Sequence, residues 1–281
     1  MKIAITGATG QLGFVVVEKL KEKTAAENLV ALVRRPEKAA DLGVAARAFD
    51  YTKPETLAVS LNGVETLLLI SGNEIGQREI QHKNVIDAAK EAGVRRIVYT
   101  SLLHAATSEM ALAPEHAATE KALIDSGITY TILRNGWYTE NYAGSIAGAI
   151  QGGGFIGSAG DGKISSATRE DFAEAAAVVL TTSGHANKIY ELGGDEAYTL
   201  SDLAAEISKQ TGKDIPYNNL PEADFAGVLV SVGLPKGFAK ILADSDAKAA
   251  QGALYTDDKT LSKLIGRPTT PLATVVKNFI S

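Results

Sequence analysis

The chain has 281 residues, of which 45% are hydrophobic and 22% charged, and its formal net charge is -5. This is the composition of a globular protein, and the length fits one large domain or two unequal ones. The acidic balance argues against a nucleic-acid partner, because binding a phosphate backbone needs a broad basic surface. The sequence contains no cysteine, which excludes disulfides, thiolate zinc sites and thiol nucleophiles.

The first residues lead straight into a strand-like run, without the basic start, apolar segment and cleavage site of a signal peptide. No apolar stretch of the sequence is long enough to cross a bilayer. We therefore expect a cytoplasmic protein with no membrane partner.

Short apolar runs alternate with helical stretches up to about Leu133, which predicts a parallel sheet built from βαβ units. The predicted strands cover 2–6, 29–33, 45–49, 65–70, 95–100 and 128–133. A helix is predicted over 77–92 from the apolar positions Ile80, Val85, Ile86 and Ala89, with Gly93 as its left-handed cap. These elements predict a doubly wound α/β domain over residues 1–134.

The alternation fades after Arg134. The glycine-rich stretch 152–162 favours hairpin turns over a mobile substrate loop. A helix is expected near 170–181, and Thr199 with Asp202 predicts a capping pair that opens a further helix. We expect residues 135–281 to form a smaller, mainly helical domain over the carboxyl edge of the sheet, and a strand near 188–192 to rejoin that sheet.

Three glycines follow the first predicted strand, at Gly7, Gly10 and Gly13. Gly7 permits a tight turn, Gly10 lets a pyrophosphate approach the backbone, and Gly13 lets the following helix pack closely on the strand. The helix N-terminus adds free N–H groups and a partial positive charge. No Lys-Ser or Lys-Thr pair follows the glycines, so the motif predicts a Rossmann dinucleotide cradle and not a P-loop.

Arg34 and Arg35 stand where an NAD-specific Rossmann site places an acidic residue against the ribose hydroxyls. A cation at this point can pair with the 2'-phosphate of NADPH. We expect Arg34, the first residue beyond the second strand, to hold that phosphate, and we expect NADPH to be preferred over NADH.

Further stretches make the sequence similar to the NmrA-like, atypical short-chain dehydrogenases, in particular the bacterial NAD(P)H:quinone oxidoreductases and triphenylmethane dye reductases. The shared stretches are Thr6 to Gly13, Thr100 to His104, Leu133 to Tyr138 and Gly160 to Lys163. The resemblance implies hydride transfer from NADPH to a quinone or similar planar acceptor. The residues that it matches to cofactor-binding positions are Gly7, Thr9, Gly10, Gln11, Leu12, Arg34, Ser71, Asn73, Tyr138, Asn141 and Tyr142.

The Tyr and Lys that serve as acid and electrostatic support in related dehydrogenases are missing. In those dehydrogenases the Lys follows the Tyr by four residues, and a Glu follows the Lys by four. Counted back from Glu120, the Lys position holds His116 and the Tyr position holds Leu112. Lys121 lies one residue out of register, about 100° around the helix. A quinone tolerates this loss, because hydride addition gives a delocalised anion that solvent can protonate. The enzyme then accelerates the reaction mainly by binding NADPH and the quinone and orienting them toward each other.

The acceptor pocket is expected to use Asn73, His104, Trp137 and Tyr138, while the catalytic residues stay open. The four histidines lack metal-ligand spacing and are expected at the surface or at caps, although His104 and His116 could reach a substrate. No nucleophile elbow supports a serine hydrolase. The main alternative is an NmrA-type redox sensor that binds NADP(H) without turnover and acts on a protein partner. An epimerase or dehydratase is disfavoured without the Tyr and Lys, and a homodimer stays open.

Overall fold

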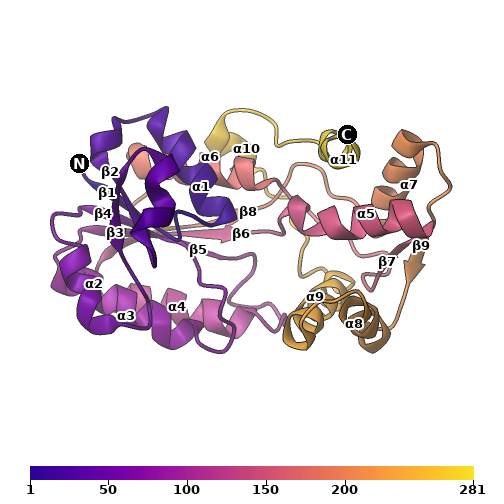
Figure 1. Ribbon diagram of the computed structural model, residues 1–281, viewed down its shortest axis with the longest axis horizontal. Coiled ribbons are helices and arrows are strands. Elements are labelled where there is room, and N and C mark those ends of the chain that lie inside the picture. The colour runs from indigo at the N-terminus through magenta and orange to yellow at the C-terminus, as the bar shows by residue number, and fades with distance from the viewer. The chain divides into compact units, whose positions relative to one another are not determined.

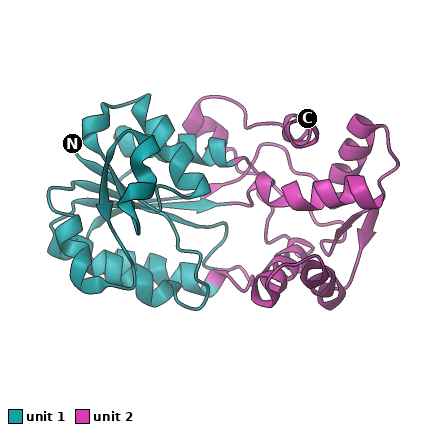
Figure 2. Ribbon diagram, in the orientation of Figure 1, with its two compact units in different colours: residues 1–106, 114–135, 169–190 teal, residues 107–113, 136–168, 191–281 magenta.

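The computed structural model describes all 281 residues and divides them into two compact units (Figure 2). Unit 1 comprises residues 1–106, 114–135 and 169–190, and unit 2 comprises residues 107–113, 136–168 and 191–281. The single boundary predicted after residue 134 differs from this division, since residues 169–190 return to unit 1. There helix α6 (Arg169–Thr181) packs against α1 (Gln11–Lys21), and Glu170 pairs with Lys19 at 3.0 Å.

A seven-stranded sheet forms the centre of unit 1, in the order β3-β2-β1-β4-β5-β6-β8. Its strands are β1 (Ile3–Thr6), β2 (Leu29–Val33), β3 (Ala45–Ala48), β4 (Thr66–Leu69), β5 (Arg96–Leu102), β6 (Thr129–Asn135) and β8 (Lys188–Leu192). The first six strands pair in parallel, which confirms the doubly wound α/β fold. The strand expected near 188–192 is β8, at the edge of this sheet.

Helices cover both faces of the sheet, with α1 and α6 on one side and α2 (Pro54–Ser60), α3 (Arg78–Glu91) and α4 (Ala113–Asp125) on the other (Figure 1). Val85, Ile86 and Ala89 of α3 pack into the core against β4 and β5, and Gly93 follows the helix with a φ of 72°. Ile80, expected on the same face, is instead exposed. It lies five residues before Val85, which places it about 140° around the helix from that side chain.

Unit 2 is mainly helical, and its regular elements are α5 (Ala143–Gly152), α7 (Leu200–Thr211), α8 (Glu222–Ser231), α9 (Lys236–Ala249), α10 (Thr260–Ile265), α11 (Leu272–Ile280), β7 (Phe155–Gly157) and β9 (Tyr217–Asn219). Thr199 and Asp202 form the predicted capping box at the start of α7. The expected hairpin in the glycine-rich stretch is wrong, because β7 pairs in parallel with β9, about sixty residues later. Gly153 ends α5 in the left-handed conformation. None of the helices in the structure combines the length and the apolar character needed to cross a bilayer.

Candidate functional site

The glycine loop joins β1 to α1 with very close backbone packing. Gly7 has a φ of 58°, in the left-handed region that glycine adopts without strain. A Cβ on Gly13 would overlap the Gly7 carbonyl and the Ala8 backbone, and a Cβ on Gly10 would lie 3.1 Å from the Gly7 carbonyl oxygen. Gly13 is therefore required for packing the helix on the loop, while Gly10 borders the open side of the turn.

The N-terminus of α1 is open to a ligand. Gly10 occupies the N-cap position, so no side chain caps the helix, and no acidic residue stands in the first turn. The first N–H groups of a helix lack partners within the helix, and they sit at its positive end. Thr9, Gly10 and Gln11 are exposed, whereas the side chain of Leu12 is buried and only its backbone can face a ligand. This arrangement fits a pyrophosphate group.

The loop lies where the strand order reverses, between the adjacent strands β1 and β4. In open α/β sheets, ligands bind at this point, beyond the carboxyl ends of the strands. The end of β4 is held on both sides, because the Ile70 N–H donates to Thr6 Oγ1 at 2.9 Å and the Ser71 N–H donates to Thr100 Oγ1 at 3.0 Å. Ser71 is half-buried and Asn73 is exposed at this edge.

Arg34 follows β2 with its guanidinium exposed, and it pairs with Glu74 at 3.5 Å. Glu74 is steadied by Gln81, whose amide donates to the second carboxylate oxygen at 2.8 Å. The Arg34–Glu74 pair is open to solvent on both sides, and pairs of this kind contribute little to stability, so a phosphate can displace the carboxylate. Sequence reasoning missed Glu74, although it directly follows Asn73.

A buried polar network anchors the loop that carries Ser71 and Asn73. The Gly72 N–H donates to His82 Nε2 at 2.9 Å, and His82 Nδ1 lies 3.0 Å from Thr119 Oγ1. Arg78 Nε donates to the Gly72 carbonyl, so both polar groups of this peptide segment are held. Burial lowers the pKa of His82 to about 3, which keeps the ring neutral and able to accept the Gly72 N–H. The expectation that His82 lies at the surface or at a cap is therefore wrong.

His116 is also buried, against the expectation of a surface or pocket position. Its Nδ1 lies 2.7 Å from the Tyr99 hydroxyl and its Nε2 lies 3.4 Å from an Arg78 nitrogen. Burial, and then the positive charge of Arg78, lowers the pKa of His116 to about 3. Its ring is neutral and both of its nitrogens face core residues.

Glu120 and Lys121, which follow the positions of the missing acid pair, also make contacts with other residues of the protein. Glu120 accepts hydrogen bonds from Ser101 at 2.6 Å and from Arg134 at 2.6 and 2.9 Å. Lys121 is exposed and pairs with Asp125 at 2.6 Å, one turn along the helix. This part of α4 is therefore a structural ion-pair cluster with a solvated outer face.

The remaining expected residues divide between the two units. His104 follows β5 in unit 1, half-exposed and with a φ of 57°, a conformation that is uncommon for a residue with a side chain. In unit 2, Tyr138 is half-buried and pairs with Ala167 through an isolated parallel bridge, and Asn141 is exposed. Trp137 and Tyr142 are buried there. The structure thus gathers the glycine loop, Arg34, Ser71 and Asn73 at one edge of unit 1.

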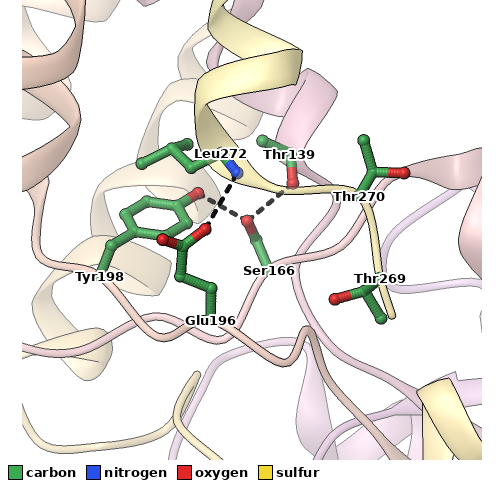
Figure 3. A pocket seen from close by; sticks show the side chains of 7 residues that line it. All are labelled: Thr139, Ser166, Glu196, Tyr198, Thr269, Thr270 and Leu272. Carbon is green, nitrogen blue, oxygen red and sulfur yellow. Dashed lines mark hydrogen bonds between the residues drawn. The ribbon is translucent and has the colours of Figure 1, made fainter. Parts of the chain in front are cut away.

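Two cavities of the structure lie within unit 2. We call the first the hydroxyl cavity: its volume is about 10 Å³, and its lining includes Thr139, Ser166 and Tyr198 (Figure 3). The three hydroxyls form a chain, with 2.7 Å from Thr139 to Ser166 and 2.5 Å from Ser166 to Tyr198. Glu196, at the same cavity, accepts the Leu272 N–H at 3.2 Å. The volume corresponds to about one water molecule. This cavity is therefore part of the hydrogen-bonded interior of unit 2 and is too small for a cofactor or a quinone.

We call the second the aromatic cavity: its volume is about 30 Å³, and its lining includes Trp137, Tyr142, Phe155, Phe225 and Asp246. Tyr142 and Phe155 stack at an angle, with ring centroids 6.2 Å apart. This cavity combines aromatic walls with buried polar atoms.

Comparison with known proteins matches residues 7–183 to the NAD(P)H-binding family. Quinone oxidoreductase 2 of Escherichia coli (strain K12) is 58% identical, over 99% of both chains. The crystal structure of an NADPH-dependent quinone oxidoreductase from E. coli, complexed with NADPH, superimposes with a TM-score of 0.97 over 99% of this chain and 100% of that chain.

Two more distant relatives cover the chain equally well. Triphenylmethane reductase of Citrobacter sp., complexed with NADP(H), shares 39% identity with a TM-score of 0.95, over 99% of this chain and 100% of that chain. An NmrA-like family domain-containing oxidoreductase of Aspergillus flavus is 30% identical, over 100% of this chain and 95% of that protein.

Proposed function

Because this chain belongs to the NmrA-like, NAD(P)H-binding family, we propose that it is an NADPH-dependent oxidoreductase that reduces quinones. The observation that carries the proposal is the 58% identity to a quinone oxidoreductase over nearly the whole of both chains. The open glycine loop supports it, since its geometry fits a dinucleotide. The cytoplasm, where NADPH is available, is the proposed location.

The residues of unit 1 would hold NADPH along the carboxyl edge of the sheet. The backbone of Thr9, Gly10, Gln11 and Leu12 would bind the pyrophosphate at the N-terminus of α1. Arg34 would hold the 2'-phosphate after releasing Glu74, with a charge-assisted hydrogen bond. By resemblance, Ser71 and Asn73 would line the cofactor site further along. The resemblance also matches Tyr138, Asn141 and Tyr142 to cofactor-binding positions.

The reduction of a quinone needs one hydride and one proton. Bound NADPH supplies the hydride. Asn73, His104, Trp137 and Tyr138 are proposed to hold the acceptor in register and to exclude competing orientations. His116 is buried and neutral against Tyr99 and Arg78, and Lys121 is solvated, so neither is placed to deliver a proton. We therefore assign protonation of the hydroquinone anion to solvent.

The redox-sensor alternative predicts NADP(H) binding without turnover. The missing acid pair is compatible with it, but the full-length similarity to two reductases favours the enzyme. The deciding experiment monitors NADPH oxidation with a panel of quinones, with a triarylmethane dye and with no acceptor. The enzyme predicts fast oxidation with quinones and negligible oxidation without acceptor. A sensor predicts NADPH binding with no acceptor-dependent oxidation.

A further inference from the structure

The loop between β4 and α3 carries Ser71, Asn73 and Glu74, and side chains from other elements hold its backbone. Residues 73–77 of this loop are all exposed, so burial does little to fix their conformation. Five backbone N–H groups along residues 70–78 donate to side chains, which come from β1, β5, α3 and α4. The shape of the loop therefore depends on these hydrogen bonds.

The far end of the loop is held by Glu115, in the first turn of α4. Its Oε1 accepts the Gly76 N–H at 2.8 Å and the Arg78 N–H at 3.2 Å. Helix α3 begins at Arg78, and its N-cap residue, Gln77, makes no capping hydrogen bond with its side chain. Glu115 thus caps α3 from another helix, with its negative charge at the positive end of α3. Its Oε2 lies 3.8 Å from Arg78 Nη1, so the carboxylate also faces a cation.

The near end of the loop is held by His82, and its contacts define which ring nitrogen carries the proton. Thr119 Oγ1 donates to the Glu115 carbonyl at 2.8 Å, so it acts as an acceptor toward His82 Nδ1 at 3.0 Å. The proton of the neutral ring is therefore on Nδ1, and Nε2 accepts the Gly72 N–H at 2.9 Å. Helices α3 and α4 together fix the loop at the residue just before Asn73.

We propose that Glu115 and His82 are positioning residues for NADPH, which hold the loop in the form that presents Ser71 and Asn73 to the cofactor. This inference rests on the proposed function, since it takes NADPH as the ligand of this edge of the sheet. Exposed segments with few packing contacts open readily once their hydrogen bonds are lost. The apparent dissociation constant of a ligand rises in inverse proportion to the fraction of molecules that are ready to bind it.

Two variants release the two ends of the loop separately. Glu115→Ala removes both hydrogen bonds at the far end, and His82→Leu removes the bond to the Gly72 N–H. In calorimetric titration without an acceptor, each should raise the dissociation constant of NADPH by about three- to tenfold, as for a competent loop populated about 10–30% of the time. Glu115→Gln and His82→Gln keep an acceptor oxygen within reach of the same N–H groups, so both should recover most of the affinity.

Glu120→Gln is the matched control. Glu120 is a buried carboxylate on the same helix, but it bonds to Ser101 and Arg134 and not to the loop. The control should lower the melting temperature and change NADPH affinity by less than about twofold. Amide hydrogen exchange reports on the loop itself: exchange across residues 70–78 should quicken in Glu115→Ala and His82→Leu only. Bound NADPH should slow that exchange again, because coupling between loop order and binding is reciprocal.

Three results would overturn the positioning role. Faster exchange of the loop with unchanged NADPH affinity would show that loop order does not govern binding. An equal loss of NADPH affinity in Glu120→Gln would show a general effect of lower stability. His82→Gln binding NADPH as weakly as His82→Leu would exclude the hydrogen bond to Gly72 as the cause.

The outcome does not depend on one variant or on turnover. Should His82→Leu fail to fold, Glu115→Ala decides alone, because its contacts lie at the exposed end of the loop, where water can replace the carboxylate. Binding is measured without an acceptor. A protein that shows these affinity losses but no quinone-dependent oxidation of NADPH would refute the proposed reaction and leave the positioning role standing.

Discussion

Replacing Arg34 by Ala should convert a protein that prefers NADPH into one that distinguishes weakly between NADPH and NADH. The Arg34 side chain is 68% exposed, and its guanidinium pairs with Glu74 at 3.5 Å. A charge-assisted bond to the 2'-phosphate contributes about 1.5–3 kcal/mol, and displacing an exposed carboxylate costs at most about 1 kcal/mol. The net preference attributable to Arg34 is then about 0.5–3 kcal/mol, or roughly two- to 150-fold in the ratio of dissociation constants.

The assay is calorimetric titration of NADPH and NADH into the unmodified protein and into Arg34→Ala. NADPH affinity should fall by the full factor while NADH affinity changes less than about twofold. Arg35→Ala is the matched control, one residue away and also exposed, and should have a smaller effect. Glu74→Gln should strengthen NADPH binding a few-fold, because it removes the competing charge. Equal losses of NADPH and NADH affinity in Arg34→Ala would refute the assignment.

Three further outcomes follow from the geometry of the two units. Gly10→Val should abolish cofactor binding with only a small fall in apoprotein melting temperature. Gly13→Val should prevent stable folding, because its side chain would overlap the backbone of the loop. A comparable loss of apoprotein stability in both variants would contradict this distinction. His116→Ala should lower stability because a buried side chain is lost, but it should reduce quinone turnover by less than tenfold. Lys121→Ala, at an exposed position, should also reduce turnover by less than tenfold. A thousandfold loss of turnover in either variant with NADPH binding intact would identify a true acid. Asp246 has a folded-state pKa of about 6, above its ordinary 3.8, so its stabilising contribution is present below about pH 4 and is lost as the pH rises through 6. Chemical unfolding should show Asp246→Asn matching the unmodified protein at pH 4 and exceeding it at pH 8 by up to about 3 kcal/mol, and a difference independent of pH would disprove the assignment of this pKa.

The parts of the fold that local patterns encode were predictable. The six parallel strands follow from short apolar runs, and the turn of the glycine loop follows from the spacing of Gly7, Gly10 and Gly13. The capping box at Thr199 is also a local feature. By contrast, the glycine-rich stretch gave no sign of β9, because the strand that pairs with β7 lies about sixty residues away.

The buried histidines show which features the sequence could predict and which depend on the fold. His82 stands three and four residues before Val85 and Ile86, on the buried face of α3, so helical periodicity could have placed it inside. Its role as acceptor of the Gly72 N–H depends on the loop after β4 folding back on the helix. The aromatic cavity was harder still to predict from the sequence, because Trp137, Phe225 and Asp246 come from segments that are distant in the sequence.

The central claim is that the protein transfers a hydride from NADPH to a quinone and leaves protonation to solvent. Its most direct measurement is a single turnover with NADPH deuterated at the transferred position, which follows cofactor oxidation and hydroquinone formation together. We predict one hydroquinone formed for each NADPH oxidised, with a slower reaction for the deuterated cofactor and nearly the same rate in His116→Ala. Binding of NADPH without oxidation in the presence of every quinone tested would contradict it and would favour the redox sensor.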